Sequence, residues 1–590
     1  MQGVRTRSTG DGSAGANGHI QPSNCVQRSS VSITADPTGL DFPTPTKVSW
    51  FASLPDDCPA LNVQLSSIAV VPADDTTVTP TTTTIAVAPA GAQTFTPTRT
   101  TQYVVIVGDT SGSSSATNSA SVTVTVGRVP ATVLIDSTTV DPMDVLVGAL
   151  TEPSNEWRVV ELCGDNLELN FGSKREIRVP SRRILRAAPG CERGLRKLGP
   201  LVFSNNKVVG GPLFRIVGDD VEFSGFRLQG PESGVGSDET PGSTGISIVP
   251  PGCPPLQDGS VPADCVLNGL HHVEISNMEI SQWQLAGVEV LDTHKPSSAL
   301  GRLWNTNVGA VRIVNNFIHD NRHTHIGYGV VASDGGYALI ERNVFNQNRH
   351  AIAGSSKDQT GRDFSGYTAL ENLILPGGGL HCGWYGCYHT HIVDMHGDDS
   401  EWPQDHNCGN AGETMIIQRN TILYTNAAAI KIRGNPEDKA VVDRNVFAWG
   451  NRFDAIAQNG SCSWWKFWSG IDLFTGEDGD ITNPIKVTAT NVFGADPMSK
   501  LGSCRFAGDE VEDQFMASGV TWWVRSGLTG QWRYLNTMSE QVSELQFQDL
   551  DGDGICDVLP RMRFPETIPK KYSKGGRTPW LSVGVVGPQP

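Results

Sequence analysis

The amino-acid sequence predicts an all-β protein in which a long stack of short strands follows an N-terminal antiparallel sandwich and precedes a small acidic C-terminal segment. Three observations predict this class. Alternating runs rich in Thr and Val come first, similar strand-like segments then recur through the middle of the 590-residue chain, and a loop of Asp and Gly residues lies near its end. Gly (64) and Pro (36) are abundant, which suits turn-rich β structure. A chain of this length suggests about two to four domains.

The N-terminal part divides into residues 1–29, expected to form a flexible leader, and residues 30–128, expected to form the sandwich. The leader contains no apolar core of a signal peptide, so we expect that an export signal has been removed or that the start was engineered. Runs such as TQYVVIV and SVTVTV, separated by turn residues, indicate antiparallel strands. The stretch resembles bacterial immunoglobulin-like modules. We interpret it as a spacer with Trp50 in its core and Cys25–Cys58 as a possible clasp.

Residues 129–500 carry a repeat in which alternating apolar and polar letters lead to an Asn. Asn316, Asn343, Asn420 and Asn445 occupy the same place in four such segments, and the close intervals are 27 residues (316 to 343) and 25 residues (420 to 445). A repeat this short cannot bury a core alone and must stack on its neighbours. Short strands joined by turns, with a stacked Asn at a fixed point, fit a parallel β-helix. The pattern resembles the right-handed parallel β-helix superfamily. The segments are HHVEISNMEISQW (271–283), GAVRIVNNFIHDN (309–321), YALIERNVFNQN (337–348), TMIIQRNTILYTN (414–426) and AVVDRNVFAWGN (440–451).

One interval of the repeat is about three times too long. Asn343 and Asn420 are 77 residues apart, which must accommodate one or two further coils together with an inserted loop near residues 355–412. Nine of the 13 histidines lie between His319 and His406. Because loops that interrupt a solenoid tend to gather on one binding face, we expect a functional surface here.

Twelve cysteines indicate disulfides rather than a metal module. None shows the paired CxxC spacing of a zinc module, so an oxidising, extracellular compartment is the better interpretation, as a secreted or cell-surface protein. The net charge of −17 argues against nucleic acid as a partner. No apolar run is long enough to span a bilayer. The oligomeric state stays open. Plausible short-range cysteine pairs are Cys163 with Cys191, Cys253 with Cys265, and Cys382 with Cys387 or Cys408.

The C-terminal segment, residues 501–590, contains the loop DLDGDGICD, with Asp549, Asp551, Asp553 and Asp557 around two glycines. Alternating carboxylates on a tight turn supply the hard oxygen ligands that Ca²⁺ prefers. The segment resembles one FG-GAP or VCBS repeat, a propeller-blade unit with a calcium loop. We therefore expect Ca²⁺ there, in a structural role, with the segment packed on the end of the β-helix.

The strand IVDMH (392–396) gives the candidate catalytic site. Side chains alternate along a strand, so Asp394 and His396 should face out of the coil. In the strand AIKIRG (429–434), Lys431 and Arg433 should face the same way. When the insertion DSEWPQDHNCGN is left out, about one coil separates the two strands, which would place His396 over Arg433 and Asp394 over Lys431. A base beside a cation suits removal of the C5 proton of a uronic acid, because the cation neutralises the carboxylate.

The same stretch resembles the DPHD signature of β-helix mannuronan C5-epimerases. DMHGDD matches it, and RNTILYTNAAAIKIRG is similar to the segment that follows one coil later in that family. The resemblance implies that His396 abstracts the proton, Arg433 neutralises the carboxylate and Asp394 is the motif aspartate. Met395 stands where the family has proline, Gly397 replaces the second acidic residue, and Lys431 replaces a small one.

Other interpretations of the histidine-rich region stay open. His389, His391, His396 and His406 could bind a transition metal, and the repeat also resembles the NosD-like β-helix group. A glycoside hydrolase would use two carboxylates, and a non-enzymatic surface or adhesion protein would use none of these groups. The carboxylates that could form a hydrolase pair are Asp394, Asp398, Asp399, Glu401 and Asp405.

The sequence therefore favours a secreted protein that acts on an extracellular, uronic-acid-containing polysaccharide by lyase- or epimerase-type proton abstraction. Tyr328, His325 and His391 are candidate substrate-binding residues, because they precede or flank the proposed catalytic strand. That a β-helix protein acts on polysaccharide is an analogy of fold, and the sugar and the linkage are not defined by the sequence.

Overall fold

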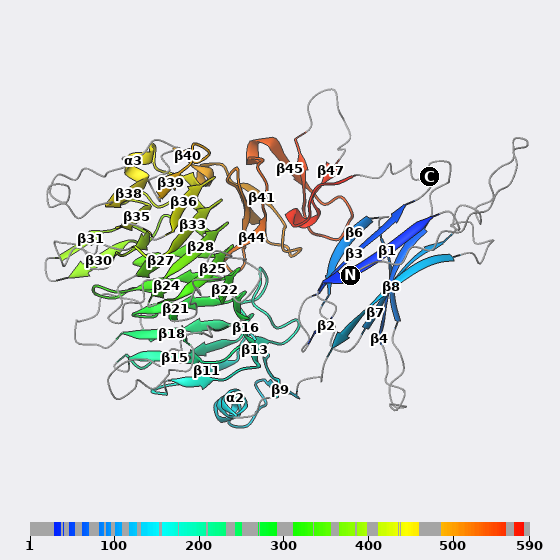
Figure 1. Cartoon of the computed structure of the whole chain (residues 1–590), viewed down its shortest axis with the longest axis horizontal. Coiled ribbons are helices and arrows are strands. Elements are labelled where there is room, and N and C mark those ends of the chain that lie inside the picture. Colours follow the sequence, from blue (N-terminus) through cyan, green and yellow to red (C-terminus); the bar gives the residue numbers. More distant parts are fainter. Residues whose placement is uncertain are drawn as a thin grey trace, which may run out of the picture. The chain divides into compact units, whose positions relative to one another are not determined.

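The computed structural model describes residues 29–582 apart from internal segments, of which the longer are 54–61, 70–81, 109–116, 232–241, 250–269, 292–310, 356–364, 398–410, 460–484 and 562–570. The chain forms two compact units, residues 1–131 and residues 132–590. Each unit is described by itself (Figure 1). Among the described residues, no helix has the length and apolarity that crossing a membrane requires.

The first unit is a sandwich of two sheets in which every described pair is antiparallel except β2 with β8, which is parallel. Trp50 and Val48 of β3 pack against Tyr103 and Val105 of β7, and all four side chains are buried, so Trp50 lies in the core as predicted. Cys25 and Cys58 lie outside the described residues. The smaller sheet has the order β1 (Ser30–Asp36), β3 (Thr46–Ser53), β6 (Ala90–Phe95), and the larger has the order β2 (Gly39–Leu40), β8 (Thr117–Val126), β7 (Thr101–Gly108), β4 (Asn62–Ala69), β5 (Thr82–Ala86).

The second unit is a parallel β-helix with three long sheets, which confirms the predicted fold class (Figure 1). Each complete coil contributes one strand to each sheet. The first sheet runs through β9 (Ala131–Ile135), β10 (Arg158–Leu162), β13 (Arg183–Ala187), β16 (Val221–Ser224), β19 (Val273–Ser276), β22 (Val311–Val314), β25 (Tyr337–Glu341), β28 (Gly366–Leu370), β33 (Thr414–Gln418), β36 (Lys439–Asp443) and β39 (Ile485–Val487).

The second sheet runs through β11 (Glu168–Asn170), β14 (Leu201–Phe203), β17 (Arg227–Gln229), β20 (Glu279–Ser281), β23 (Phe317–His319), β26 (Val344–Asn346), β29 (Leu373–Ile374), β34 (Thr421–Ile422), β37 (Val446–Phe447) and β40 (Val492–Phe493). The third sheet runs through β12 (Ile177–Val179), β15 (Gly211–Ile216), β18 (Ser243–Ile248), β21 (Ala286–Leu291), β24 (Tyr328–Ser333), β27 (His350–Ser355), β32 (Val393–Met395), β35 (Ile430–Arg433) and β38 (Ile456–Asn459). Helix α2 (Pro142–Thr151) packs on the first coil through Leu146 and Leu150.

Columns of apolar side chains fill the solenoid, because strands in register place every second residue inside on successive coils. In the first sheet, Ile313 lies over Ile340, which lies over Ala369, and the column continues to Ile417 and Val442. All five are essentially excluded from solvent. Stacking therefore supplies the core that one coil could not form alone.

The repeated asparagines stack at the turn between the first and second sheets. Asn316 Nδ2 donates to Asn343 Oδ1 at 2.9 Å and to the carbonyl of the preceding strand, and the same pattern links Asn420 to Asn445. The residue before the Asn adopts a left-handed conformation in successive coils, as at Arg342 (φ 57°). The predicted structural role of these four residues is confirmed, and Asn372 and Asn491 extend the ladder.

The long interval from Asn343 to Asn420 contains one additional coil with Asn372 in the ladder, together with a hairpin. Residues 355–412 are therefore not one insertion, because β28, β29 and β32 within them are coil strands. The hairpin consists of β30 (Leu380–Gly383) and β31 (Gly386–His389), closed by the disulfide Cys382–Cys387. Cys163–Cys191 also forms as expected, whereas Cys253, Cys265 and Cys408 lie outside the described residues.

The C-terminal segment packs on the outer face of the second sheet. Trp523 and Met516 are fully buried against Leu373 and Val344 of the solenoid. Docking is thus along the side of the coils rather than at the end, where the sequence had placed it. The segment contains a sheet of β41 (Gly502–Cys504), β42 (Asp513–Ala517), β43 (Trp522–Arg525) and β44 (Trp532–Asn536), followed by the pairs β45 (Leu545–Gln548) with β46 (Asp557–Pro560) and β47 (Lys571–Tyr572) with β48 (Leu581–Ser582).

Candidate functional site

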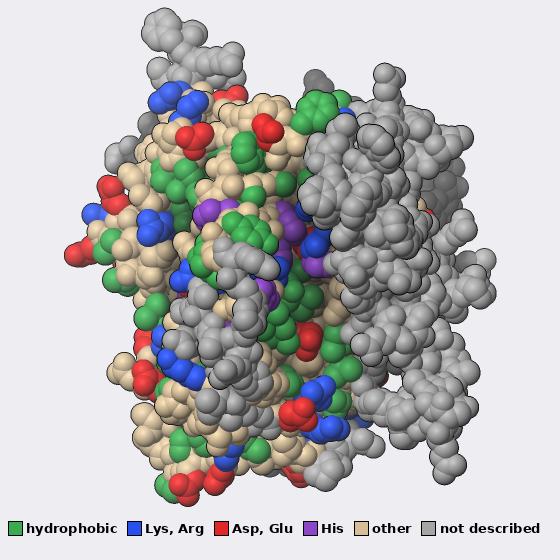
Figure 2. Space-filling model, turned by 90° about the vertical axis from the view of Figure 1, so that its left-hand side faces the viewer, with side chains coloured by type: hydrophobic (Ala, Val, Ile, Leu, Met, Phe, Trp, Pro, Cys, Tyr) green, Lys and Arg blue, Asp and Glu red, His purple; other side chains and the backbone are tan. Residues whose placement is uncertain are grey.

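The third sheet brings the predicted catalytic residues together. Val393 pairs with Ile430 and Asp394 with Lys431, as the sequence predicted, and the next residues along these strands are His396 and Arg433. Val393 and Met395 enter the core, so the intervening side chains leave the coil on its outer face. The face shown in Figure 2 gathers several histidines together with lysine and arginine side chains.

His396, Asp394 and Arg433 form one polar cluster. Arg433 donates from Nε to Asp394 Oδ1 at 3.2 Å and from Nη2 to Oδ2 at 2.6 Å. His396 Nε2 lies 2.7 Å from Asp394 Oδ2 and also contacts Arg433 Nη2. The side chains of His396 and Arg433 are 26 % and 17 % exposed, so both reach solvent while remaining fixed by the carboxylate.

Asp394 differs from the sequence expectation because its side chain is fully buried even though it leaves the coil. Burial alone would raise the pKa of this carboxyl, but His391, His396 and Arg433 hold that pKa well below its usual value of 3.8. Asp394 is therefore ionised at neutral pH and acts as the fixed counter-charge of the cluster. Tyr367, from beneath, donates its hydroxyl to the Asp394 carbonyl at 3.1 Å.

Two buried histidines lie behind the carboxylate. His391 Nε2 is 2.8 Å from Asp394 Oδ1, and the ring of His350, one coil earlier, stacks on His391 with centroids 4.6 Å apart. Burial lowers the pKa of His391 to about 4 and lowers that of His350 well below 6.5. Both imidazoles are thus neutral. Because His391 is buried, it supports the cluster from inside rather than lining a surface for substrate, and His350 was not recognised in the sequence.

The remaining predicted substrate-binding residues lie beside this cluster on earlier coils. Tyr328 stacks on His350 with centroids 5.7 Å apart, and its hydroxyl accepts a hydrogen bond from Arg349 at 3.3 Å. His325 is exposed and its ring contacts His381 of the hairpin edge-on at 5.2 Å. The hairpin therefore adds His381 to this surface.

Arg349 and His381 were missed in the sequence, where neither lies in a repeat-like motif. Arg349 donates from Nε to His381 Nδ1 at 2.9 Å. Burial, with Arg349 beside it, lowers the pKa of His381 to about 4, so its Nδ1 is free of a proton and can accept that bond. Of the metal set proposed from the sequence, His389 is exposed on the hairpin and His406 lies outside the described residues.

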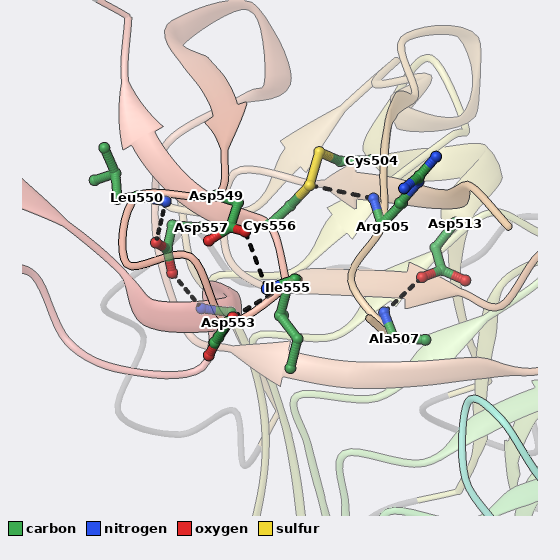
Figure 3. The surroundings of a disulfide bond; sticks show 12 residues. Cys504, Arg505, Ala507, Asp513, Asp549, Leu550, Asp553, Ile555, Cys556 and Asp557 are labelled. Carbon is green, nitrogen blue, oxygen red and sulfur yellow. Dashed lines mark hydrogen bonds between the residues drawn. A yellow bond between two sulfur atoms is a disulfide. The ribbon is translucent and has the colours of Figure 1, made fainter. Parts of the chain in front are cut away.

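The acidic loop near the C-terminus gathers three of its four predicted ligands, of which Asp549 and Asp557 are labelled in Figure 3. Carboxylate oxygens of Asp549, Asp551 and Asp557 lie within 4.8 Å of one another, whereas Asp553 lies outside this group. Lys574 Nζ contacts Asp551 Oδ2 at 2.5 Å and Asp553 Oδ2 at 3.2 Å. Carboxylate oxygens are the ligand type that Ca²⁺ prefers, and the Lys574 ammonium balances part of their charge.

The comparisons define no family for the chain. No family model and no curated protein matches it. Among solved structures, Escherichia coli YbhC aligns with a TM-score of 0.29 and 9 % identity over 61 % of this chain and 84 % of its own. The full-length tailspike protein 2 (TSP2, ORF211) from Escherichia coli O157:H7 bacteriophage CAB120 aligns with a TM-score of 0.30 and 10 % identity over 77 % of this chain and 66 % of its own.

Scores this low carry no argument about function, and the fold assignment depends on the strand pairing described above. The fold and the cluster together define the chain as a parallel β-helix protein in which a buried carboxylate joins a histidine and an arginine on the outer face of one sheet.

Proposed function

We propose that the protein acts on an extracellular polysaccharide containing uronic acids, by abstraction of the C5 proton in a lyase or epimerase reaction. The observation that supports this proposal is the His396–Asp394–Arg433 cluster, in which a base and a cation lie on neighbouring coils and both reach solvent. Removal of a proton beside a carboxylate needs this pair, because the cation stabilises the negative charge that develops as the proton leaves.

The roles of the three side chains follow from their contacts. His396 Nε2 lies 2.7 Å from Asp394 Oδ2 and contacts Arg433 Nη2, so both partners fix the ring, and in this proposal the imidazole takes up the C5 proton. Asp394 thus orients the imidazole and holds the guanidinium by two hydrogen bonds. In this proposal Arg433 binds the substrate carboxylate through a guanidinium N–H that Asp394 does not occupy.

Further contacts to the polymer would come from neighbouring coils. Lys431, beside Asp394 in register, supplies a second positive charge. Tyr328 lies one coil before the β27–β32 pair on the same sheet, and His325 contacts His381 of the hairpin, so a chain bound along the stack would meet them next. This placement supports binding of an extended polymer rather than of a single sugar.

A panel of uronic-acid polymers tests the reaction. The wild-type chain is expected to produce either absorbance from unsaturated ends, which marks a lyase, or solvent hydrogen at C5 without cleavage, which marks an epimerase. His396→Gln should abolish either signal, whereas His389→Gln, which changes an exposed histidine on the hairpin, should leave it unchanged. Binding of the polymers without either signal in a folded wild-type chain would instead favour a non-enzymatic surface protein.

We also propose that the protein resides outside the cell and that its C-terminal loop binds Ca²⁺ in a structural role. Three disulfides among the described residues support the oxidising compartment. Asp549, Asp551 and Asp557 would hold the ion, displacing the Lys574 ammonium from Asp551. Added Ca²⁺ is expected to raise the melting temperature of the wild type but not of Asp549→Asn, and an equal rise in both would refute this site.

A further inference from the structure

We propose that His350, His391 and Asp394 form a binding site for a divalent first-row transition metal ion, for which Zn²⁺ is the probe. One ligand atom from each residue lies within 4.8 Å of the other two, and all three residues are buried. Two imidazoles and one carboxylate are a donor set that such ions take, with positions left for water. This inference does not depend on the reaction proposed above.

His350 provides the first independent indication. Its side chain is fully buried, yet its Nε2 has no hydrogen-bond partner among the described residues. Its Nδ1 faces the His391 carbonyl at 2.7 Å, which requires the proton to be on Nδ1. Nε2 therefore carries a buried lone pair. Burying a polar atom without a partner costs free energy unless the atom meets a hydrogen-bond donor or a metal ion.

His391 presents the same arrangement. Its Nδ1 lies 3.0 Å from the Thr390 hydroxyl oxygen, which can accept a hydrogen bond from Nδ1–H, and in that tautomer Nε2 carries a lone pair. Nε2 lies 2.8 Å from Asp394 Oδ1, but the contact is poorly directed, and Nε2 has no well-aligned hydrogen-bond partner among the described residues. With the proton on Nδ1, the Nε2 lone pair would face the carboxylate oxygen, and a cation bound to both atoms would remove the repulsion between them.

The surroundings resemble the outer contacts of a metal site. A metal-binding histidine usually has an oxygen acceptor on its other ring nitrogen, which fixes the tautomer, and both histidines have one here. Asp394 would offer the ion Oδ1, which also accepts from Arg433 Nε, and would keep Oδ2 for Arg433 Nη2 and His396, so the two clusters share one carboxylate.

Zinc titration of the full chain tests the site. After removal of metals with a chelator, calorimetry and elemental analysis in saturating Ca²⁺, which occupies the acidic loop, are expected to show one Zn²⁺ per chain. Co²⁺ in its place should give visible bands of a low-coordinate site with imidazole ligands. His350→Gln should weaken binding by about 100-fold or more, and Thr390→Val, which removes only an outer contact, by about 10- to 100-fold.

His389→Gln is the matched control, since it changes an exposed histidine two residues from His391, and it should bind Zn²⁺ like the wild type. The proposal is wrong if the folded wild type has no such site, if His389→Gln loses it, or if folded His350→Gln keeps it. If His350→Gln does not fold, the zinc affinity of Thr390→Val and the Co²⁺ spectrum of the wild type test the site instead. An unchanged affinity together with no low-coordinate bands would then reject the site. Zinc binding is measured without substrate, so the two proposals can fail separately. If the chain binds Zn²⁺ but changes no uronate, only the proposed reaction is rejected. If it changes a uronate but binds no Zn²⁺, only this inference is rejected.

Discussion

At the scale of single residues, Asp394 organises the candidate site. It is fully buried, accepts two hydrogen bonds from Arg433 and contacts His391 and His396. A buried charge is tolerated only when partners surround it, so the carboxylate and the guanidinium depend on each other. The cluster is therefore expected to contribute to stability as well as to chemistry.

Asp394→Asn should lower the free energy of unfolding by about 3–5 kcal/mol, because it leaves the Arg433 charge without its carboxylate. Urea unfolding at neutral pH measures the loss. The control is Asp438→Asn, which alters an exposed carboxylate 3.4 Å from Lys439 and should cost about 1 kcal/mol or less. Equal effects of the two substitutions would show that the Asp394 cluster is not a cooperative unit.

Buried histidines predict a loss of stability in mild acid. The unfolded His391 imidazole takes up a proton as the pH falls below 6.5, whereas in the folded protein its pKa is about 4. The folded pKa is depressed, so the contribution is present above pH 6.5 and is lost as the pH falls from 6.5 to about 4, by about 1–3 kcal/mol. His391→Gln should flatten this dependence and exposed His389→Gln should not. An unchanged slope in His391→Gln would contradict the assignment.

The residue-scale site was partly predictable. Strand alternation and a coil of regular length were enough to place His396 beside Arg433 and Asp394 beside Lys431. They could not reveal that Asp394 would be buried, because solvent exclusion on the outer face depends on neighbouring coils. His350 was missed for the same reason, since it comes from the previous coil and its strand HAIAGS has no motif of its own.

At the scale of elements, the asparagine ladder fixes the turn between two sheets in successive coils. Asn372 shows how each member works: its Nδ2 donates to Asn420 Oδ1 at 2.9 Å and to the Ile340 carbonyl at 2.8 Å, and its Oδ1 accepts from the Asn343 backbone at 2.9 Å. The sequence identified four members from their spacing. Asn372 was not identified in the sequence, because the hairpin and a segment outside the described residues lengthen the interval from Asn372 to Asn420. The letters LENLIL around Asn372 nevertheless match the repeat.

Asn372→Ala should destabilise the solenoid by about 3 kcal/mol or more, because several buried polar groups lose their partners at once. Thermal and urea unfolding measure the change. Asn166→Ala, at an exposed turn, is the control and should stay within about 0.5 kcal/mol of the wild type. If Asn372→Ala lowers the free energy of unfolding by less than about 1 kcal/mol, water satisfies the polar groups that Asn372 leaves, and the ladder is not needed for stability.

At the scale of the whole second unit, the C-terminal segment covers apolar side chains on the outer face of the second sheet. Trp523 is fully buried there with Leu373, and Thr421 of β34 donates its hydroxyl to Ser518 at 2.8 Å. The sequence predicted the acidic loop and the presence of a separate segment. It could not predict the docking face, because the solenoid residues that the C-terminal segment covers follow the same apolar and polar alternation as the other strands.

Trp523→Ala should lower the free energy of unfolding by about 3–5 kcal/mol, since it opens a large cavity between the C-terminal sheet and the coils. Leu528→Ala removes a side chain that is 56 % exposed on the same segment and should change stability by about 0.5 kcal/mol or less. Dye binding to exposed apolar surface should rise only in Trp523→Ala. No difference between the two variants would argue against a docked segment.

The most direct test of the proposed reaction is exchange of the C5 hydrogen of a polymeric uronate with deuterium oxide, followed by proton magnetic resonance. The His396–Asp394–Arg433 cluster predicts that the wild-type chain incorporates deuterium at C5 and that folded His396→Gln does not, whereas His389→Gln matches the wild type. Exchange that persists in His396→Gln, or its absence with every uronate offered to the folded wild type, would contradict proton abstraction by this cluster.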